Sequence, residues 1–224
     1  MTGAAALLGA MFALFQDSTV IAVAPVNVPP QLQVNVDAQR TFGALLAQQL
    51  RAMGFAVVPP ETTSVVWLRA RDSLGGYFDS YTGKAIPAKR DSVFMTMRRM
   101  LHDRHGAAVW LRPSIIVVGR PFTGGKVKWD GVEEESGGAG GLLHAFLGGT
   151  SVGTIPAASF AVYVEDLEGN EVYLGLGGIR LLARVRNKRF ETVLDALATP
   201  ERNVAAVRLA LDSLPAKLSP TRRP

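Results

Sequence analysis

The sequence predicts an α/β protein of the α+β kind, with two strand-helix units followed by an antiparallel meander and a mixed sheet with flanking helices. Short β-branched apolar runs closed by prolines alternate with segments of helical apolar spacing over the first half of the chain. After residue 106 the pattern changes to several strand-like stretches joined by turn signals. Strands and helices in this order suit a mixed sheet with helices on at least one face.

The first strand-helix unit begins with the buried strand predicted over residues 19–26, TVIAVAPV. Asp37 is a suitable N-cap for a helix, because its carboxylate can accept from free backbone N–H groups in the first turn. Apolar residues then recur at helical spacing as far as Gly54, which is placed to end the helix. Residues 55–58, FAVV, predict the next strand, which Pro59 ends.

The second unit is less regular. Residues 62–71 fit either a helix or a strand, whereas residues 86–105 predict a helix that ends at Gly106. On that helix Arg98 is expected on the outer side together with two further arginines. Residues 107–118 predict a long strand interrupted at Arg112-Pro113.

The rest of the chain predicts the meander and the closing helices. Residues 166–170, DLEGN, are a strong hairpin signal between two strand patterns. The predicted strands are residues 127–132, 157–165, 171–176 and 179–185, and the predicted terminal helices are residues 189–197 and 201–214.

A chain of 224 residues is long enough for one well-filled domain, which we place at residues 19–214, with a flexible tail over residues 215–224. Residues 1–18 form an apolar N-terminal segment. Its uninterrupted run over residues 3–15 is too short to cross a membrane and has the length of a signal-peptide core, although no Lys or Arg precedes it. We therefore expect export to the periplasm or cell envelope; a buried N-terminal helix in a cytoplasmic protein is the alternative.

Composition excludes several function classes. The chain has no cysteine, which excludes disulfides, thiolate catalysis, cysteine-based zinc sites and an acylated N-terminal cysteine. The net charge of +5 fixes no partner. The densest basic run, residues 184–189, has no interleaved aromatic residues, so it indicates a solvated turn, and we expect no nucleic-acid partner.

Residues 75–84, GGYFDSYTGK, end in Gly-Lys and resemble part of a phosphate-binding loop. The Walker pattern requires a glycine where Phe78 stands and a hydroxyl residue where Ala85 stands. A tight turn is the better interpretation, with Tyr77, Phe78 and Tyr81 packed beneath it. Residues 175–178, GLGG, lack the third glycine of a dinucleotide-binding loop and indicate a bulge or a close strand approach.

The remaining candidates for chemistry are weak. His102 and His105 are three residues apart at a helix end, but no third metal ligand of matching geometry is evident, and the helix dipole also favours histidine there. The acidic cluster around residues 130–135 is expected to keep a loop soluble. No G-x-S-x-G motif presents a serine nucleophile. We therefore predict no catalytic residue, no cofactor and no metal.

An ordered series of strand and turn patterns resembles bacterial envelope proteins related to the curli export channel protein and to the N-terminal domain of the TolB translocation protein. The quoted segments are IAVAPV, MGFAVVPP, GGYFDSYTGK, HGAAVWLRPSIIVV, VKWDGV and VYVEDLEGNEVYLGLGGIRLL, within residues 19–214. The resemblance implies an α/β domain used for assembly or interaction, with no active site to transfer. The chain departs from the lipoproteins among them because it has no cysteine to acylate.

We therefore expect a non-catalytic, exported cell-envelope protein that acts through protein–protein interaction or assembly. The expected partner is another envelope protein or a second copy of the chain, and a peripheral contact with a membrane is a further expectation. The alternative is a small-molecule or nucleotide-binding enzyme whose site no motif describes. The candidate interaction surface comprises Tyr77, Phe78, Tyr81, Trp129, Asp130 and His144.

Overall fold

The computed structural model describes residues 18–32, 37–123, 125–137, 152–186, 189–193 and 195–218; the candidate residue His144 lies outside these ranges. The strands are β1 (Val20–Val23), β2 (Ala56–Val58), β3 (Val109–Thr123), β4 (Lys126–Trp129), β5 (Val132–Glu135), β6 (Val152–Glu165), β7 (Glu171–Leu181), β8 (Ala183–Arg186) and β9 (Arg189–Thr192). The helices are the short 3-10 turn η2 (Pro30–Leu32), α2 (Ala38–Ala52), α3 (Pro60–Ser73), α4 (Pro87–His105), α6 (Pro200–Leu211) and α7 (Leu214–Leu218).

The main sheet is mixed, as predicted. Strand β1 pairs in parallel with β2 on one side and with β3 on the other. Strand β6 then pairs antiparallel with β3 over nearly the whole length of both, and β7 pairs antiparallel with β6. The order β2-β1-β3-β6-β7 therefore joins a parallel half to an antiparallel half through β3.

Helix boundaries follow local signals in the sequence. Asp37 caps α2 by accepting from the backbone N–H of Arg40 at 3.1 Å. Gly106 ends α4 with a left-handed backbone, φ 68°, which glycine adopts without steric cost. The ambiguous residues 62–71 are helical, and Pro60, in the first turn of α3, suits a helix start.

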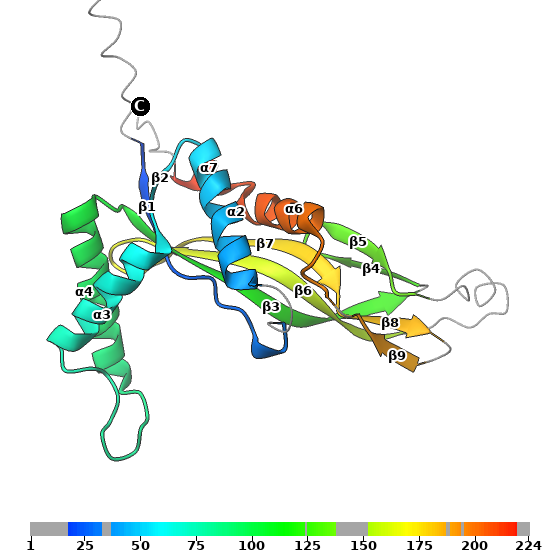
Figure 1. Cartoon of the computed structure of the whole chain (residues 1–224), viewed down its shortest axis with the longest axis horizontal. Helices are drawn as coiled ribbons and strands as arrows, with labels where there is room; N and C mark the ends of the chain where they lie inside the picture. Colours follow the sequence, from blue (N-terminus) through cyan, green and yellow to red (C-terminus); the bar gives the residue numbers. More distant parts are fainter. Residues whose placement is uncertain are drawn as a thin grey trace, which may run out of the picture.

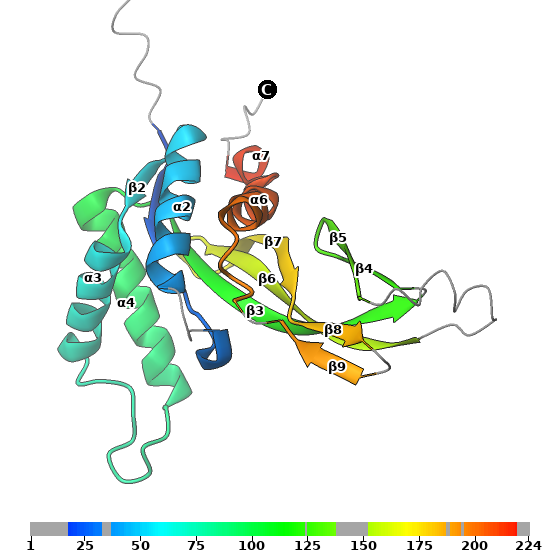
Figure 2. The ribbon, with the colours of Figure 1, turned by 45° about the vertical axis from the view of Figure 1, so that its right-hand side comes forward.

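Two helical layers cover opposite faces of the sheet (Figures 1 and 2). Ile21 and Val23 of β1 face the core formed with α2, α6 and the antiparallel strands. Ala22, between them in the sequence, faces a second core formed with α3 and α4. This alternation follows from the two-residue period of a strand, so β1 is covered on both sides.

Helix α6 packs unusually close to β7, at two glycines. A Cβ added to Gly175 would come within 1.9 Å of the carbonyl oxygen of Ala210, and one added to Gly177 within 2.0 Å of the carbonyl oxygen of Ala206. Both distances are far below van der Waals contact. The two glycines therefore allow the backbone of α6 to pack directly against β7. The sequence had indicated a bulge or a close approach of two strands at these residues. The bulge is also present nearby, where the β6–β7 register shifts between Ala158 and Ser159.

Beyond the helices, β3 and β6 continue into an arm that carries β4, β5, β8 and β9 (Figure 2). The backbone N–H of Gly178 donates to the carbonyl oxygen of Asp130 at 2.8 Å, which holds the β4–β5 hairpin against β7. The arm has its own apolar core, made of Phe122, Val127, Trp129, Ile155, Ala157, Leu181 and Ala183. The arm is therefore a packed extension of the sheet.

Three expectations are corrected. The helix predicted over residues 189–197 is wrong: residues 189–192 form β9, because pairing with β8 outweighs local helical spacing. The single strand predicted over residues 127–132 is a hairpin that turns at Asp130-Gly131, with positive φ at both residues. Strand β3 runs through Pro113, whose carbonyl still accepts from the backbone N–H of Asn27 at 3.0 Å. In addition, α7 continues to Leu218, within the segment expected to be a flexible tail.

Candidate functional site

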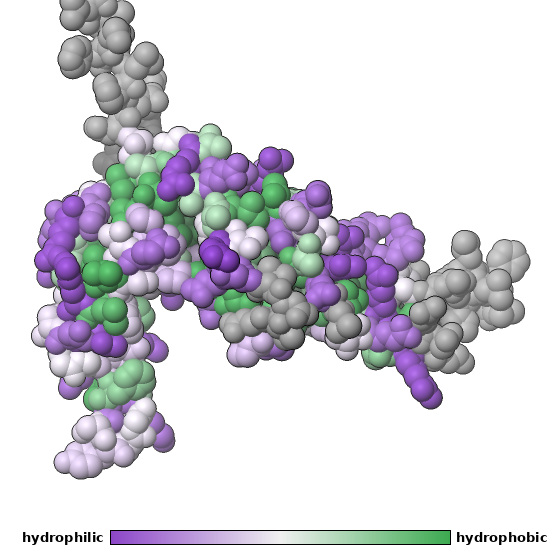
Figure 3. Space-filling model, viewed as in Figure 1, coloured by the Kyte–Doolittle hydropathy of each residue, from purple (hydrophilic) through white to green (hydrophobic). Residues whose placement is uncertain are grey.

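The aromatic loop, defined here as residues 75–86, connects α3 to α4 and extends away from the sheet (Figures 1 and 3). Its two sides are joined by backbone hydrogen bonds from Ile86 N–H to the Tyr77 carbonyl at 2.7 Å and from Asp79 N–H to the Lys84 carbonyl at 2.8 Å. Phe78 and Ala85 form an antiparallel bridge between them. The loop is therefore a narrow, internally bonded turn, and Gly83 turns the chain with φ 66°.

The Asp79 carboxylate organises the tip of the loop. Its Oδ1 accepts from the backbone N–H of Tyr81 at 3.0 Å, from the backbone N–H of Thr82 at 2.7 Å and from the Thr82 hydroxyl at 2.9 Å. The Thr82 backbone N–H, followed by its hydroxyl and the Tyr81 N–H, lowers the pKa of Asp79 below its ordinary value, since each bond favours the charged form.

This arrangement predicts a pH-dependent loop. Because the folded pKa of Asp79 is lowered, its contribution to order is complete above the ordinary aspartate pKa of about 3.9 and is lost as pH falls through the lower folded value. An NMR titration that follows the Thr82 amide should show a midpoint below the ordinary value. In Asp79→Asn this titration should disappear, and the Thr82 amide should exchange faster at neutral pH. An ordinary midpoint in the parent would contradict the arrangement.

The three aromatic residues of the loop have different roles. Tyr77 packs inward, with its ring centroid 6.4 Å from Trp67 and 4.4 Å from Phe78. Phe78 is 56% exposed and Tyr81 is 97% exposed. The expectation that all three pack beneath the turn is therefore wrong for Tyr81. Tyr77 anchors the loop, while the rings of Phe78 and Tyr81 are exposed.

The candidate residues Trp129 and Asp130 lie far from the aromatic loop, in the arm. Trp129 is 4% exposed and its indole N–H donates to the carbonyl of Ala158 at 3.4 Å. The Asp130 carboxylate accepts from Arg120 at 2.8 Å and from the Ser159 hydroxyl at 2.6 Å. Both side chains thus have partners inside the arm, and the structure does not bring them together with Tyr77, Phe78 and Tyr81.

A shallow hollow of about 420 Å³ lies over residues 128–133 of this hairpin. All of its lining residues belong to the one hairpin, so it is a surface depression and not a cleft between elements.

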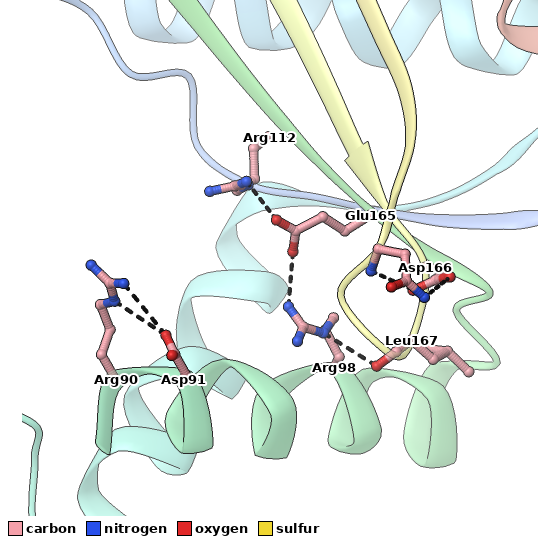
Figure 4. Close-up of polar contacts among 8 residues, drawn as sticks. Arg90, Asp91, Arg98, Arg112, Glu165, Asp166 and Leu167 are labelled. Carbon is pink, nitrogen blue, oxygen red and sulfur yellow. Dashed lines mark hydrogen bonds and ion pairs between the residues drawn. The ribbon is translucent and has the colours of Figure 1, made fainter. Parts of the chain in front are cut away.

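An ion cluster that sequence reasoning missed joins α4 to the sheet (Figure 4); Arg98 and Glu165 are buried in it and Arg112 is partly exposed. Glu165 accepts from Arg98 at 2.8 Å and from Arg112 at 2.5 Å, and Arg98 also donates to the carbonyl of Leu167 at 3.2 Å. Arg98 was expected on the outer side of its helix, yet it is only 8% exposed. The cluster is suited to a structural role, because the guanidinium groups of Arg98 and Arg112 both lie beside the Glu165 carboxylate.

Arg112 of this cluster lies between two aromatic rings. Its guanidinium carbon is 5.1 Å from the ring centroid of Trp110 and 4.4 Å from that of Tyr163. Cation–π contacts of this kind hold an arginine in one orientation, which here directs it at Glu165.

In the described ranges of the chain, His102 and His105 at the end of α4 belong to no cluster of metal-ligating groups. The His102 ring nitrogen Nδ1 lies 3.1 Å from the carbonyl of Ala107, which accounts for its position beside Gly106. Among the residues that the structure describes, no group of three or more His, Cys, Asp or Glu side chains has the geometry to hold a metal. In the same residues, every helix is too short or too polar to cross a membrane.

Comparison with known proteins gives little. No protein-family model matches the chain, and no curated protein matches it. The solved structures with some similarity include the lipoprotein GNA1162 from Neisseria meningitidis, with 16% sequence identity and a TM-score of 0.35 over 72% of this chain and 82% of that chain. A TM-score of this size does not establish a common fold. The resemblance to the curli and TolB proteins thus stays a prediction.

Proposed function

We propose that this chain is a non-catalytic protein of the cell envelope that acts by contact with another envelope component, and that the aromatic loop is its contact surface. The observation that carries the proposal is the combination of a fixed backbone with exposed rings: Asp79 orders the tip, while Tyr81 is almost wholly exposed. Exposed aromatic groups held on an ordered loop lose little conformational entropy on binding, which favours recognition.

The apolar run over residues 3–15, which has the length of a signal-peptide core, supports an envelope location. The carboxylates of Asp130 and Glu165, which have little exposed surface, are ion-paired with arginines of the fold, and the proposal gives neither of them a catalytic role.

Replacement of Tyr81 by alanine tests the proposal. We expect Tyr81→Ala to lower the amount of chain retained by intact envelope membranes about tenfold, since burial of a large side chain contributes about 1.5–3 kcal/mol. Retention is measured by co-sedimentation with envelope membranes that contain both their proteins and their lipids. Ser80→Ala, at an exposed neighbouring position, is the matched control and should bind like the parent.

Equal retention of the parent and Tyr81→Ala would refute the loop as the contact surface. Recovery of the native chain, with residues 1–18 still attached, from the cytosol would refute the envelope location.

A further inference from the structure

We infer that the component bound by the aromatic loop is the anionic surface of a phospholipid membrane, an inference that depends on the proposed function. Two kinds of group occur at this end of the molecule. Phe78 and Tyr81 are the exposed rings of the loop, Lys84 is its exposed lysine, and Lys89 is an exposed lysine in the first turn of α4, directly after the loop. Aromatic residues, tyrosine above all among those present here, favour the boundary between headgroups and acyl chains.

The charges of the loop are arranged to suit an anionic surface. The one carboxylate of residues 75–89 belongs to Asp79, and its Oδ1 is turned to the loop's own backbone and hydroxyl donors. Within the described part of the chain, neither Lys84 nor Lys89 has a carboxylate at ion-pair distance. The neighbouring Arg90 is paired with Asp91 at 3.4 Å. Asp79 keeps its negative charge and interacts with Lys89, so residues 75–89, with one carboxylate and two lysines, carry a net charge of +1.

The shape of the loop also suits a flat surface. Figure 3 shows it as a narrow extension that stands clear of the helices and the sheet. Backbone groups at the tip are bonded within the loop, from Asp79 N–H to the Lys84 carbonyl and from Gly83 N–H to the Asp79 carbonyl at 2.9 Å. A turn with satisfied backbone groups can enter the headgroup region without leaving those groups unpaired. The net positive charge together with the exposed rings therefore fits an anionic lipid surface, and a protein partner is the other outcome of the test below.

The inference is tested with protein-free vesicles. The full chain is mixed with vesicles of phosphatidylcholine alone or of equal parts phosphatidylcholine and phosphatidylglycerol, and binding is measured by co-sedimentation at two salt concentrations. We expect binding to the anionic vesicles to exceed binding to the neutral ones and to fall as salt is raised. Because every variant contains residues 1–17, any binding by that segment is common to all of them.

Two variants separate the aromatic from the electrostatic contribution. Tyr81→Ala should lower the partition coefficient on anionic vesicles about tenfold. Lys84→Gln should lower it about fivefold, in keeping with the attraction of one lysine near an anionic surface. Lys217→Gln removes an exposed lysine of α7 and is the matched control, which should bind like the parent.

The outcomes distinguish this inference from the proposed function. Equal binding of parent and Tyr81→Ala to anionic vesicles, or equal binding of the parent to neutral and anionic vesicles, would overturn the lipid inference. Retention by protein-containing envelope membranes that depends on Tyr81, without binding to protein-free vesicles, would identify a protein partner. That result would overturn the lipid inference and leave the proposed function in place.

Discussion

Replacement of Gly177 by alanine is expected to lower the free energy of unfolding by about 3 kcal/mol or more. The added methyl group would lie 2.0 Å from the Ala206 carbonyl oxygen and 2.8 Å from the Ala206 carbonyl carbon. The obstacle is helix backbone, which cannot change rotamer to make room. Helix α6 would have to move away from β7, and the buried residues Ala206, Val207 and Ala210 would lose contacts with the main core.

Gly43→Ala is the matched control for this substitution. Gly43 lies inside α2, and a Cβ there would meet nothing closer than 3.9 Å from the side chain of Val26. Alanine at an interior helix position without such a clash should raise stability by about 0.5–1 kcal/mol. Chemical denaturation followed by circular dichroism measures both variants. A change of less than about 1 kcal/mol for Gly177→Ala would show that α6 does not sit on the strand as described.

Replacement of Glu165 by glutamine is expected to cost about 3–5 kcal/mol, the range for removal of one partner from a buried ion pair. Two guanidinium groups face this carboxylate, and Arg98 is buried, so its charge would be left without compensation. The same change would weaken the contact that Arg98 makes between α4 and the β6–β7 turn. Hydrogen exchange should therefore increase along α4 more than along α2.

Glu133→Gln provides the control for charge removal. Glu133 pairs with Lys126 at 2.7 Å and with Lys128 at 3.0 Å, and both lysine side chains are largely exposed. Exposed pairs contribute about 0–1 kcal/mol, so this variant should unfold within that range of the parent. Similar losses for both glutamate variants would mean that the cluster at Glu165 is solvated.

Most elements of the first half of the fold could be predicted because their signals are local; the exception is residues 62–71, whose spacing fitted a helix or a strand. The cap at Asp37, the stop at Gly106 and the apolar spacing between them all act within a few residues. The parallel pairing of β1 with β2 follows from the short helical connection between them.

The features that sequence reasoning missed depend on distant partners. Arg98 is buried because Glu165, 67 residues away, faces it, and nothing near Arg98 in the chain indicates that pairing. Residues 189–192 have a helical apolar spacing but form β9, which pairs with β8. That pairing depends on the β8–β9 hairpin and cannot be recognised from residues 189–192 alone. The glycines at positions 175 and 177 are likewise explained only by the close packing of α6, which lies about thirty residues later in the chain.

The turn at residues 75–86 could be predicted, whereas the exposure of its rings could not. Glycines, Asp79 and aromatic residues identified residues 75–86 as a turn, since turn chemistry is local. Whether a ring packs or is exposed depends on how far the turn extends from the body of the protein, and the structure leaves Tyr81 in solvent. Trp129 and Asp130 were expected to belong to an interaction surface, yet the core of the arm encloses Trp129 and Arg120 pairs with Asp130.

The long antiparallel pairing of β3 with β6 connects the two ends of the molecule. Both strands run from the layer covered by α4 into the arm, and their pairing continues without a break from Trp110–Glu165 to Thr123–Val152. Arg98 joins α4 to Glu165, at one end of this ladder. A force directed along the strands would load many of its backbone hydrogen bonds together, so the ladder is a mechanical connection between the α4 end of the sheet and the arm.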